Sequence, residues 1–311
     1  MENIVEVRHL SHKYNTDWAI RDINLSIKSK GILGLLGSNG AGKSTTMNII
    51  CGVLNQTEGE VFINGINLRK NPVEAKKNIG FLPQKPPLHM DLTVYEYLVH
   101  CAELRRMPRS KVKEAVEIAM ERCGITHFRK RLIRQLSGGY QQRVGIAQAI
   151  VHNPVFVVLD EPTNGLDPNQ IVEIRMLIKR IAKEHTVLIS THILSEVQAM
   201  CNDIRMIEHG KMVFSGTMQD FDNYIVPNSF IVSFENSPSL EDLKALDNVL
   251  NVDEVYTGTY KIRFEGDDNI TEKVVKESVQ KGWGLKEISL ERSSLDTVFA
   301  QLSGKLKNNK K

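Results

Sequence analysis

Residues 37 to 44 read Gly37-Ser38-Asn39-Gly40-Ala41-Gly42-Lys43-Ser44 and match the pattern G-x-x-x-x-G-K-[ST] at every fixed position. The preceding residues, 31–36, are a continuous apolar run that predicts a buried parallel strand, and a helix is expected to begin near Gly42. A glycine-rich loop between such a strand and a helix can fold closely around phosphate groups, with the helix dipole favouring their negative charge. The stretch therefore predicts a nucleotide-binding domain of the α/β class.

Within this loop, Lys43 is expected to reach the β and γ phosphates and Ser44 to bind Mg²⁺. A glycine-rich turn could have this spacing by chance, but the predicted strand and helix on either side argue against that alternative. The remaining residues assigned to nucleotide binding here are Gly37, Ser38, Asn39, Gly40, Ala41, Gly42 and Thr45.

A pair of carboxylates follows a second apolar run. Residues 155–159 are five consecutive apolar residues, and Asp160 and Glu161 come directly after them. A buried strand that ends here places both side chains at the carboxyl edge of the sheet, where ligands of open α/β folds bind. Asp160 is then the carboxylate that orients magnesium, and Glu161 is the candidate base for the attacking water. Acidic pairs are also common in loops, so this assignment depends on the phosphate-binding loop.

Residues 136–143 read Leu136-Ser137-Gly138-Gly139-Tyr140-Gln141-Gln142-Arg143 and resemble the signature motif of ABC-type ATPases. Ser137 is also a natural N-cap, followed by two glycines and a helix through Ala149, so it predicts a second anion-binding helix terminus. The resemblance assigns Ser137, Gly138 and Gly139 to nucleotide binding. Tyr140 departs from the family, in which glutamine is the commonest residue, and we expect it to tune activity without abolishing it.

Other elements of the family follow in the expected order over residues 1 to about 225. Tyr14 resembles the aromatic residue that stacks on adenine, and Gln84 the glutamine that contacts Mg²⁺ and the catalytic site. Residues 165–167 resemble the D-loop, and His192 the catalytic switch histidine. Alone, Tyr14 or His192 would more often be a packing or surface residue. The resemblance further implies a head-to-tail homodimer, or a heterodimer with a similar subunit, in which the signature of one subunit closes the ATP site of the other.

The sequence divides into two expected domains and a tail. Residues 1–225 predict an ABC-type domain with a mixed sheet and a helical subdomain at about 85–150. Residues 226–304 predict strands and helices in the order βαββαβ, typical of a ferredoxin-like α+β module, with a last helix at Leu295–Leu302. Residues 305–311 are expected to be a basic, frayed tail.

The charge of the second module and the number of motifs argue against a nucleic-acid partner. Residues 226–311 contain 12 lysines and arginines against 14 acidic residues, and four of the 12 lie in the tail, so this module lacks the basic surface that nucleic acid requires. The alternative is an ABC-type ATPase acting on nucleic acid or the ribosome. It would be expected to contain a long coiled coil or two nucleotide domains, whereas this sequence has one Gly-Lys-Ser and one Leu-Ser-Gly-Gly.

The sequence fits a subunit of a membrane transporter better than an ATPase that acts on nucleic acid or the ribosome. No apolar run approaches the roughly 18 residues of a membrane span, and residues 1–10 lack the pattern of a secretory signal. We therefore expect a Mg-dependent ATPase on the cytoplasmic face of the membrane, bound to membrane-spanning permease subunits. Residues 295–299 look like the tail of exporter ATPases of the drug, lipid, polysaccharide and gliding-motility branch, and residues 160–170 resemble the gliding-motility type most closely. Gln84, residues 85–90 and the helices from Thr93 to Leu104 are expected to form the groove that receives a permease segment.

Overall fold

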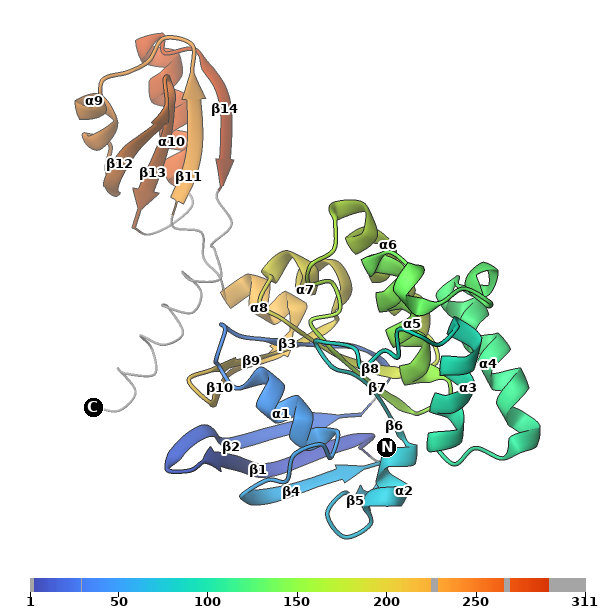
Figure 1. Ribbon diagram of the computed structural model, residues 1–311. Coiled ribbons are helices and arrows are strands. Elements are labelled where there is room, and N and C mark those ends of the chain that lie inside the picture. The colour runs from blue at the N-terminus through green and yellow to red at the C-terminus, as the bar shows by residue number, and fades with distance from the viewer. Residues whose placement is uncertain (1–2, 29, 225–228, 266–268, 291–311) are drawn as a thin grey trace. The chain divides into compact units, whose positions relative to one another are not determined.

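The computed structural model describes residues 3–28, 30–224, 229–265 and 269–290 (Figure 1). The chain divides after Met218 into two compact units. The expected boundary at residue 225 lies further along the chain and falls on a segment outside the described residues, so the domain limits stay predictions. Within the described residues, no helix is long and apolar enough to cross a membrane.

The first unit is built on a six-stranded sheet in the order β10-β9-β3-β8-β7-β6. Five strands are parallel and β10 pairs antiparallel with β9 at one edge. The strands are β3 (Gly31–Leu36), β6 (Ile79–Leu82), β7 (Phe156–Asp160), β8 (Thr186–Thr191), β9 (Asp203–Glu208) and β10 (Lys211–Thr217). Every residue of β7 and β8 is buried, as expected for central parallel strands with both faces covered.

A second, antiparallel sheet has the order β2-β1-β4-β5. It contains β1 (Val5–Tyr14), β2 (Asp17–Ile27), β4 (Glu58–Ile63) and β5 (Ile66–Asn67). Helix α1 (Lys43–Ile50) buries Met47 in one apolar cluster with Val61 of β4 and Leu35 of β3. The helix that follows the glycine-rich loop is therefore fixed by packing against both sheets.

Three helices of the first unit lie between β6 and β7, where the helical insertion was predicted. They are α3 (Val94–Leu104), α4 (Arg109–Cys123) and α5 (Gly138–Ile150), with short 3₁₀ turns η1 (Thr126–Phe128) and η2 (Ile133–Gln135). Helix α3 starts at a capping box, because the Thr93 hydroxyl accepts from the Glu96 amide while the Glu96 carboxylate accepts from the Thr93 amide. The first unit also contains α2 (Pro72–Lys77), α6 (Pro168–Ile181) and α7 (Leu194–Met200). Helix α8 (Met218–Tyr224) begins at the last residue of the first unit and continues into the second.

The second unit contains, in chain order, β11 (Ser229–Phe234), α9 (Leu240–Lys244), β12 (Val249–Tyr256), β13 (Thr259–Phe264), α10 (Asn269–Lys281) and β14 (Leu285–Leu290). Its antiparallel sheet has the order β12-β13-β11-β14. Alternate residues of β11, Phe230, Val232 and Phe234, are buried with Ile262 and Trp283. The described elements follow the predicted βαββαβ order, the order that a ferredoxin-like module requires. The predicted helix Leu295–Leu302 and the tail at 305–311 lie outside the described residues.

Candidate nucleotide site

The predicted site residues gather where parallel strands end. The glycine-rich loop follows β3, Gln84 lies two residues after β6, Asp160 ends β7, and His192 directly follows β8. The register aligns these ends, since Leu36 lies beside Thr191, and Asp160 beside Ser190. A cavity of about 580 Å³ opens at this edge. Its lining residues are Ala19, Asn39, Gly40, Gly42, Lys43, Ser44, Thr45, Gln84, Glu161, Asn164 and His192.

The loop needs glycine for conformation and for space. Gly40 and Gly42 have φ values of 81° and 107°, in the left-handed region that L side chains rarely adopt. A Cβ on Gly42 would lie 2.6 Å from Cγ2 of Ile20, and one on Gly37 would lie 2.4 Å from the carbonyl oxygen of Ile207. The loop is thus packed against β2 and β9 on its outer side.

Lys43 is buried at the centre of this loop. Its ammonium donates to the carbonyl oxygens of Gly37, at 2.8 Å, and Ser38, at 3.0 Å. It also lies 4.0 Å from Oε1 of Glu161. Burial lowers the pKa of Lys43, and the carboxylates led by Glu161 oppose that shift. The ammonium therefore lies between the phosphate-binding loop and the candidate base.

Glu161 contacts each of the other predicted catalytic residues. Its Oε2 accepts from Nε2 of Gln84 at 3.3 Å, and its Oε1 lies 3.1 Å from Nδ1 of His192. The Glu161 backbone has a φ of 47° and donates its N–H to Oγ of Ser190 at 3.0 Å. A non-glycine residue with positive φ is uncommon, and such backbone conformations concentrate at functional sites. The structure thus brings Gln84, Glu161 and His192 together around one carboxylate.

The predicted magnesium ligands differ in burial. Ser44 and Gln84 line the cavity, whereas Asp160 is buried at the end of β7 and accepts a hydrogen bond from the Ser190 hydroxyl. A hydroxyl, an amide oxygen and a carboxylate are the hard oxygen donors that Mg²⁺ prefers, and the ion usually keeps several waters. The donor set therefore fits magnesium, with Ser44 and Gln84 in the cavity lining and Asp160 buried at the end of β7.

One residue at this edge was not anticipated from the sequence. Glu208 ends β9, is 8% exposed, and accepts from the Ser38 hydroxyl at 2.9 and 3.0 Å. This carboxylate anchors the outer side of the glycine-rich loop. It has no distinctive sequence signal, because β9 was not predicted and a single glutamate before His209-Gly210 is typical of a turn.

The signature residues lie apart from this cavity. Ser137 and Gly139 line a smaller cavity with Gln170 of α6, and a Cβ on Gly139 would lie 2.8 Å from the Gln170 side chain. Ser137 occupies the N-cap position of α5, but its hydroxyl does not cap the helix. Tyr140 packs edge-on against Phe128, with ring centroids 4.5 Å apart. Within the described chain, Ser137, Gly138 and Gly139 are therefore not brought to the Lys43 cavity.

Tyr14 is also outside the described lining of that cavity. It is 50% exposed at the end of β1 and packs edge-on against His12, with ring centroids 4.7 Å apart. Exposure leaves one face of the ring available for stacking. Its predicted contact with adenine stays a prediction.

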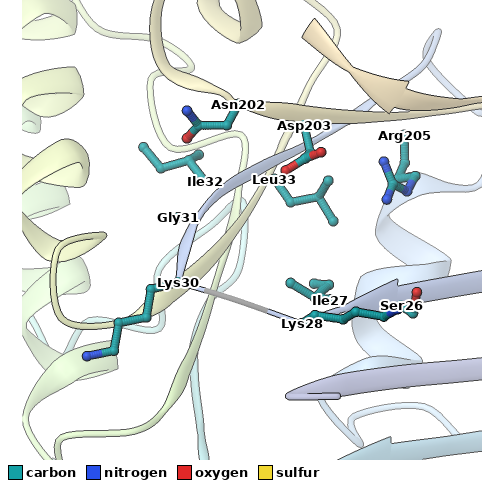
Figure 2. Close-up of a pocket in the computed structure, with 10 residues that line it drawn as sticks. All are labelled: Ser26, Ile27, Lys28, Lys30, Gly31, Ile32, Leu33, Asn202, Asp203 and Arg205. Atoms are coloured by element: carbon teal, nitrogen blue, oxygen red, sulfur yellow. The ribbon is translucent and has the colours of Figure 1, made fainter. Parts of the chain in front are cut away.

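A cavity of about 610 Å³ lies at the opposite, amino-terminal ends of β3 and β9 (Figure 2). It combines Lys28 and Arg205 with the carboxylate of Asp203. The Arg205 guanidinium already donates to the carbonyl oxygens of Ile204 and Gly216. None of the motif residues lines it, so cavity size does not decide where the nucleotide site is.

Known proteins similar to this chain are ATP-binding proteins and cassettes. The ABC transporter family matches residues 20–164. A bacitracin transport ATP-binding protein of Bacillus licheniformis is 31% identical over 98% of each chain. A linearmycin resistance ATP-binding protein of Bacillus subtilis is 27% identical over 97% of this chain and 99% of its own length. Among solved structures, the dimeric post-hydrolysis state of the ATP-binding cassette MJ0796 with ADP and Pi has a TM-score of 0.62 and 27% identity, covering 69% of this chain and 98% of that one.

The fold and site thus define an ATP-hydrolysing cassette with a helical insertion. The chain belongs to the ABC transporter family, as an ATP-binding subunit.

Proposed function

We propose that two copies of this chain, or one copy and a similar subunit, close around two ATP molecules and drive export through membrane-spanning permease subunits. The position of Glu161 is the main support for the catalytic part of this proposal. Its Oε1 lies 4.0 Å from Nζ of Lys43 and 3.1 Å from Nδ1 of His192, and its Oε2 lies 3.3 Å from Nε2 of Gln84. Three motifs far apart in sequence converge there on a single candidate base.

In this proposal Glu161 accepts a proton from the attacking water, and His192 and Gln84 orient the base and the water. Lys43 and the loop amides bind the phosphates and neutralise their charge. Ser44, Gln84 and Asp160 would hold Mg²⁺. When bound, the ion would supply further stabilisation of charge on the phosphate oxygens.

A second subunit would complete the site. The amino terminus of α5 is an anion-binding element that lies apart from the Lys43 cavity of its own chain. Ser137, Gly138 and Gly139 of one subunit would therefore contact the ATP held by the loop of the other. The similar MJ0796 cassette is dimeric with ADP and Pi bound, which supports the dimerisation that this proposal requires.

The proposed cargo is of the antibiotic class. The bacitracin and linearmycin relatives match this chain over nearly its whole length, including the part that follows the nucleotide domain. The chain would act peripherally at the cytoplasmic face of the membrane, with the permease choosing the molecule. The weakly acidic composition of residues 226–311 supports the absence of a nucleic-acid partner.

The proposed permease contact is a groove beside α3. A cavity of about 490 Å³ is lined by His89, Met90, Asp91, Leu92, Glu96 and His100. Its first lining residue, His89, lies five residues after Gln84. Pro86 and Pro87 stiffen the segment between them, and Pro83 stiffens the position before Gln84, because each proline fixes its own φ. Movement of Gln84 on nucleotide binding would thus be transmitted to the groove.

Cysteines placed at Met90 and at cytoplasmic loops of the permease are expected to cross-link in the assembled complex, with an efficiency that ATP changes. A matched pair using exposed Val53 instead of Met90 provides the control. Cross-links from the second unit, with none from Met90, would show that coupling runs elsewhere.

Ending the chain after Ile225 is expected to keep ATP binding, because all described residues of the Lys43 cavity precede that point. Stability or regulation in the complex should fall, since the truncation removes the second unit together with its own apolar core. Nucleotide titration of the shortened and full chains checks this. Loss of ATP binding by a folded truncated chain would contradict it.

A further inference from the structure

Glu196 is a buried carboxylate outside the nucleotide cavity. It lies in the first turn of α7 and is 1% exposed. The Thr163 hydroxyl donates to its Oε1 at 2.5 Å, and the Thr191 hydroxyl donates to its Oε2 at 2.9 Å. The Arg175 guanidinium lies 3.6 Å from Oε1. Because burying a charge is costly unless it is paired and hydrogen-bonded, this arrangement holds all four side chains in fixed positions.

Each partner of Glu196 belongs to a segment that leads to the site. Thr163 lies two residues after Glu161, and Thr191 directly precedes His192. The Thr191 hydroxyl also accepts from the Ile193 amide at 3.0 Å, so it fixes the backbone on both sides of His192. Arg175 lies on α6, which starts directly after residues 165–167.

We propose that Glu196 is a positioning residue that sets the distance between Glu161 and His192. The inference rests on the catalytic roles proposed above for those two residues. One carboxylate oxygen fixes the segment after Glu161 and the other fixes the segment before His192, so the 3.1 Å contact between the two catalytic groups depends on it. Through Arg175, the same carboxylate ties this pair to α6.

The substitution Glu196→Gln tests the role with little change in volume. The carboxylate accepts from both threonine hydroxyls, whereas the NH₂ group of glutamine can only donate, so one of the two hydrogen bonds must reverse its direction and both lose the charge of their acceptor. The charge that pairs with Arg175 is lost as well. We expect kcat for ATP hydrolysis to fall about 10- to 100-fold, because a misplacement of about 1 Å can cost that much. The KM for ATP should stay within about twofold, since Glu196 is hydrogen-bonded to Thr163 and Thr191 and paired with Arg175, all of which lie outside the phosphate-binding loop.

Conservative variants separate positioning from stability. We expect kcat to fall in Thr191→Val and in Thr163→Val, because each loses its hydroxyl. We expect kcat to stay close to that of the unsubstituted chain in Thr191→Ser and Thr163→Ser, which keep the hydroxyl. Glu184→Gln is the matched control, because Glu184 is an exposed glutamate paired with Arg122 at 2.7 Å and lies outside the described cavity lining. All variants are measured in the full chain, with the melting temperature recorded alongside.

The results distinguish the inference from the function on which it rests. The positioning role alone is overturned if Glu196→Gln and both valine variants keep the kcat of the unsubstituted chain while Glu161→Gln loses turnover. Wild-type turnover in Glu161→Gln overturns the catalytic roles. If Glu196→Gln does not fold, the threonine variants decide: a loss of kcat that serine restores supports the role, and a loss that serine fails to restore contradicts it.

Discussion

Replacement of Glu161 by glutamine is expected to lower ATP turnover by about 10² to 10⁴-fold and to leave ATP bound, because the amide keeps the shape of the side chain and loses its proton-accepting charge. The contacts of Lys43 with the Gly37 and Ser38 carbonyls do not involve Glu161, so the phosphate-binding loop stays intact. Single-turnover hydrolysis and a nucleotide titration on the same preparation measure the two quantities separately.

Glu184→Gln again serves as the control, since it makes the same chemical change at an exposed ion pair. Turnover near that of the unsubstituted chain in Glu161→Gln would show that another group accepts the proton. A parallel loss of ATP affinity would instead mean that Glu161 supports the loop.

Lys43→Ala is expected to weaken ATP binding and to reduce turnover by at least about 10²-fold, the cost of removing one preorganised charge-stabilising group. Lys43 is buried and is the lysine that lines the described cavity, so its substitution removes a positive charge from the position where the phosphates are expected. Lys77→Ala is the control, because Lys77 forms an exposed pair with Glu74. ATP affinity and turnover both near those of the unsubstituted chain would refute the phosphate-binding role.

Much of the fold was predictable from local patterns. The runs at 31–36 and 155–159 are long, apolar and followed by glycines or carboxylates, and they form β3 and the body of β7. Strand β9 was missed because Asp203 and Arg205 interrupt its apolar residues. Short β5 and α2 carry too few residues for any period to emerge. Tertiary pairing, rather than local pattern, decides such segments.

The site was predictable as a set of residues but not as a set of contacts. Residues 37–44, Gln84, Glu161 and His192 follow four parallel strands, and parallel strands bring such ends together. The hydrogen bonds of Glu161 could not be read from spacing. Glu208 and Glu196 were missed for the same reason, since their significance lies in burial and partners that only the folded chain defines.

Some sequence-based expectations remain predictions. The adenine contact of Tyr14, the contact of residues 137–139 with a second subunit's ATP, and the likeness to gliding-motility ATPases are of this kind. The first two concern contacts with a nucleotide or a second chain. Residues 295–299, on which part of the exporter comparison rests, lie outside the described residues.

Sedimentation of the full-length Glu161→Gln chain with ATP and Mg²⁺ tests the shared-site account most directly. The account predicts a dimer that retains two ATP molecules, and a monomer when Ser137→Glu is added, because the added carboxylate would face the phosphates of the partner's ATP and repel them. A chain that binds ATP and remains monomeric at every concentration measured would contradict it.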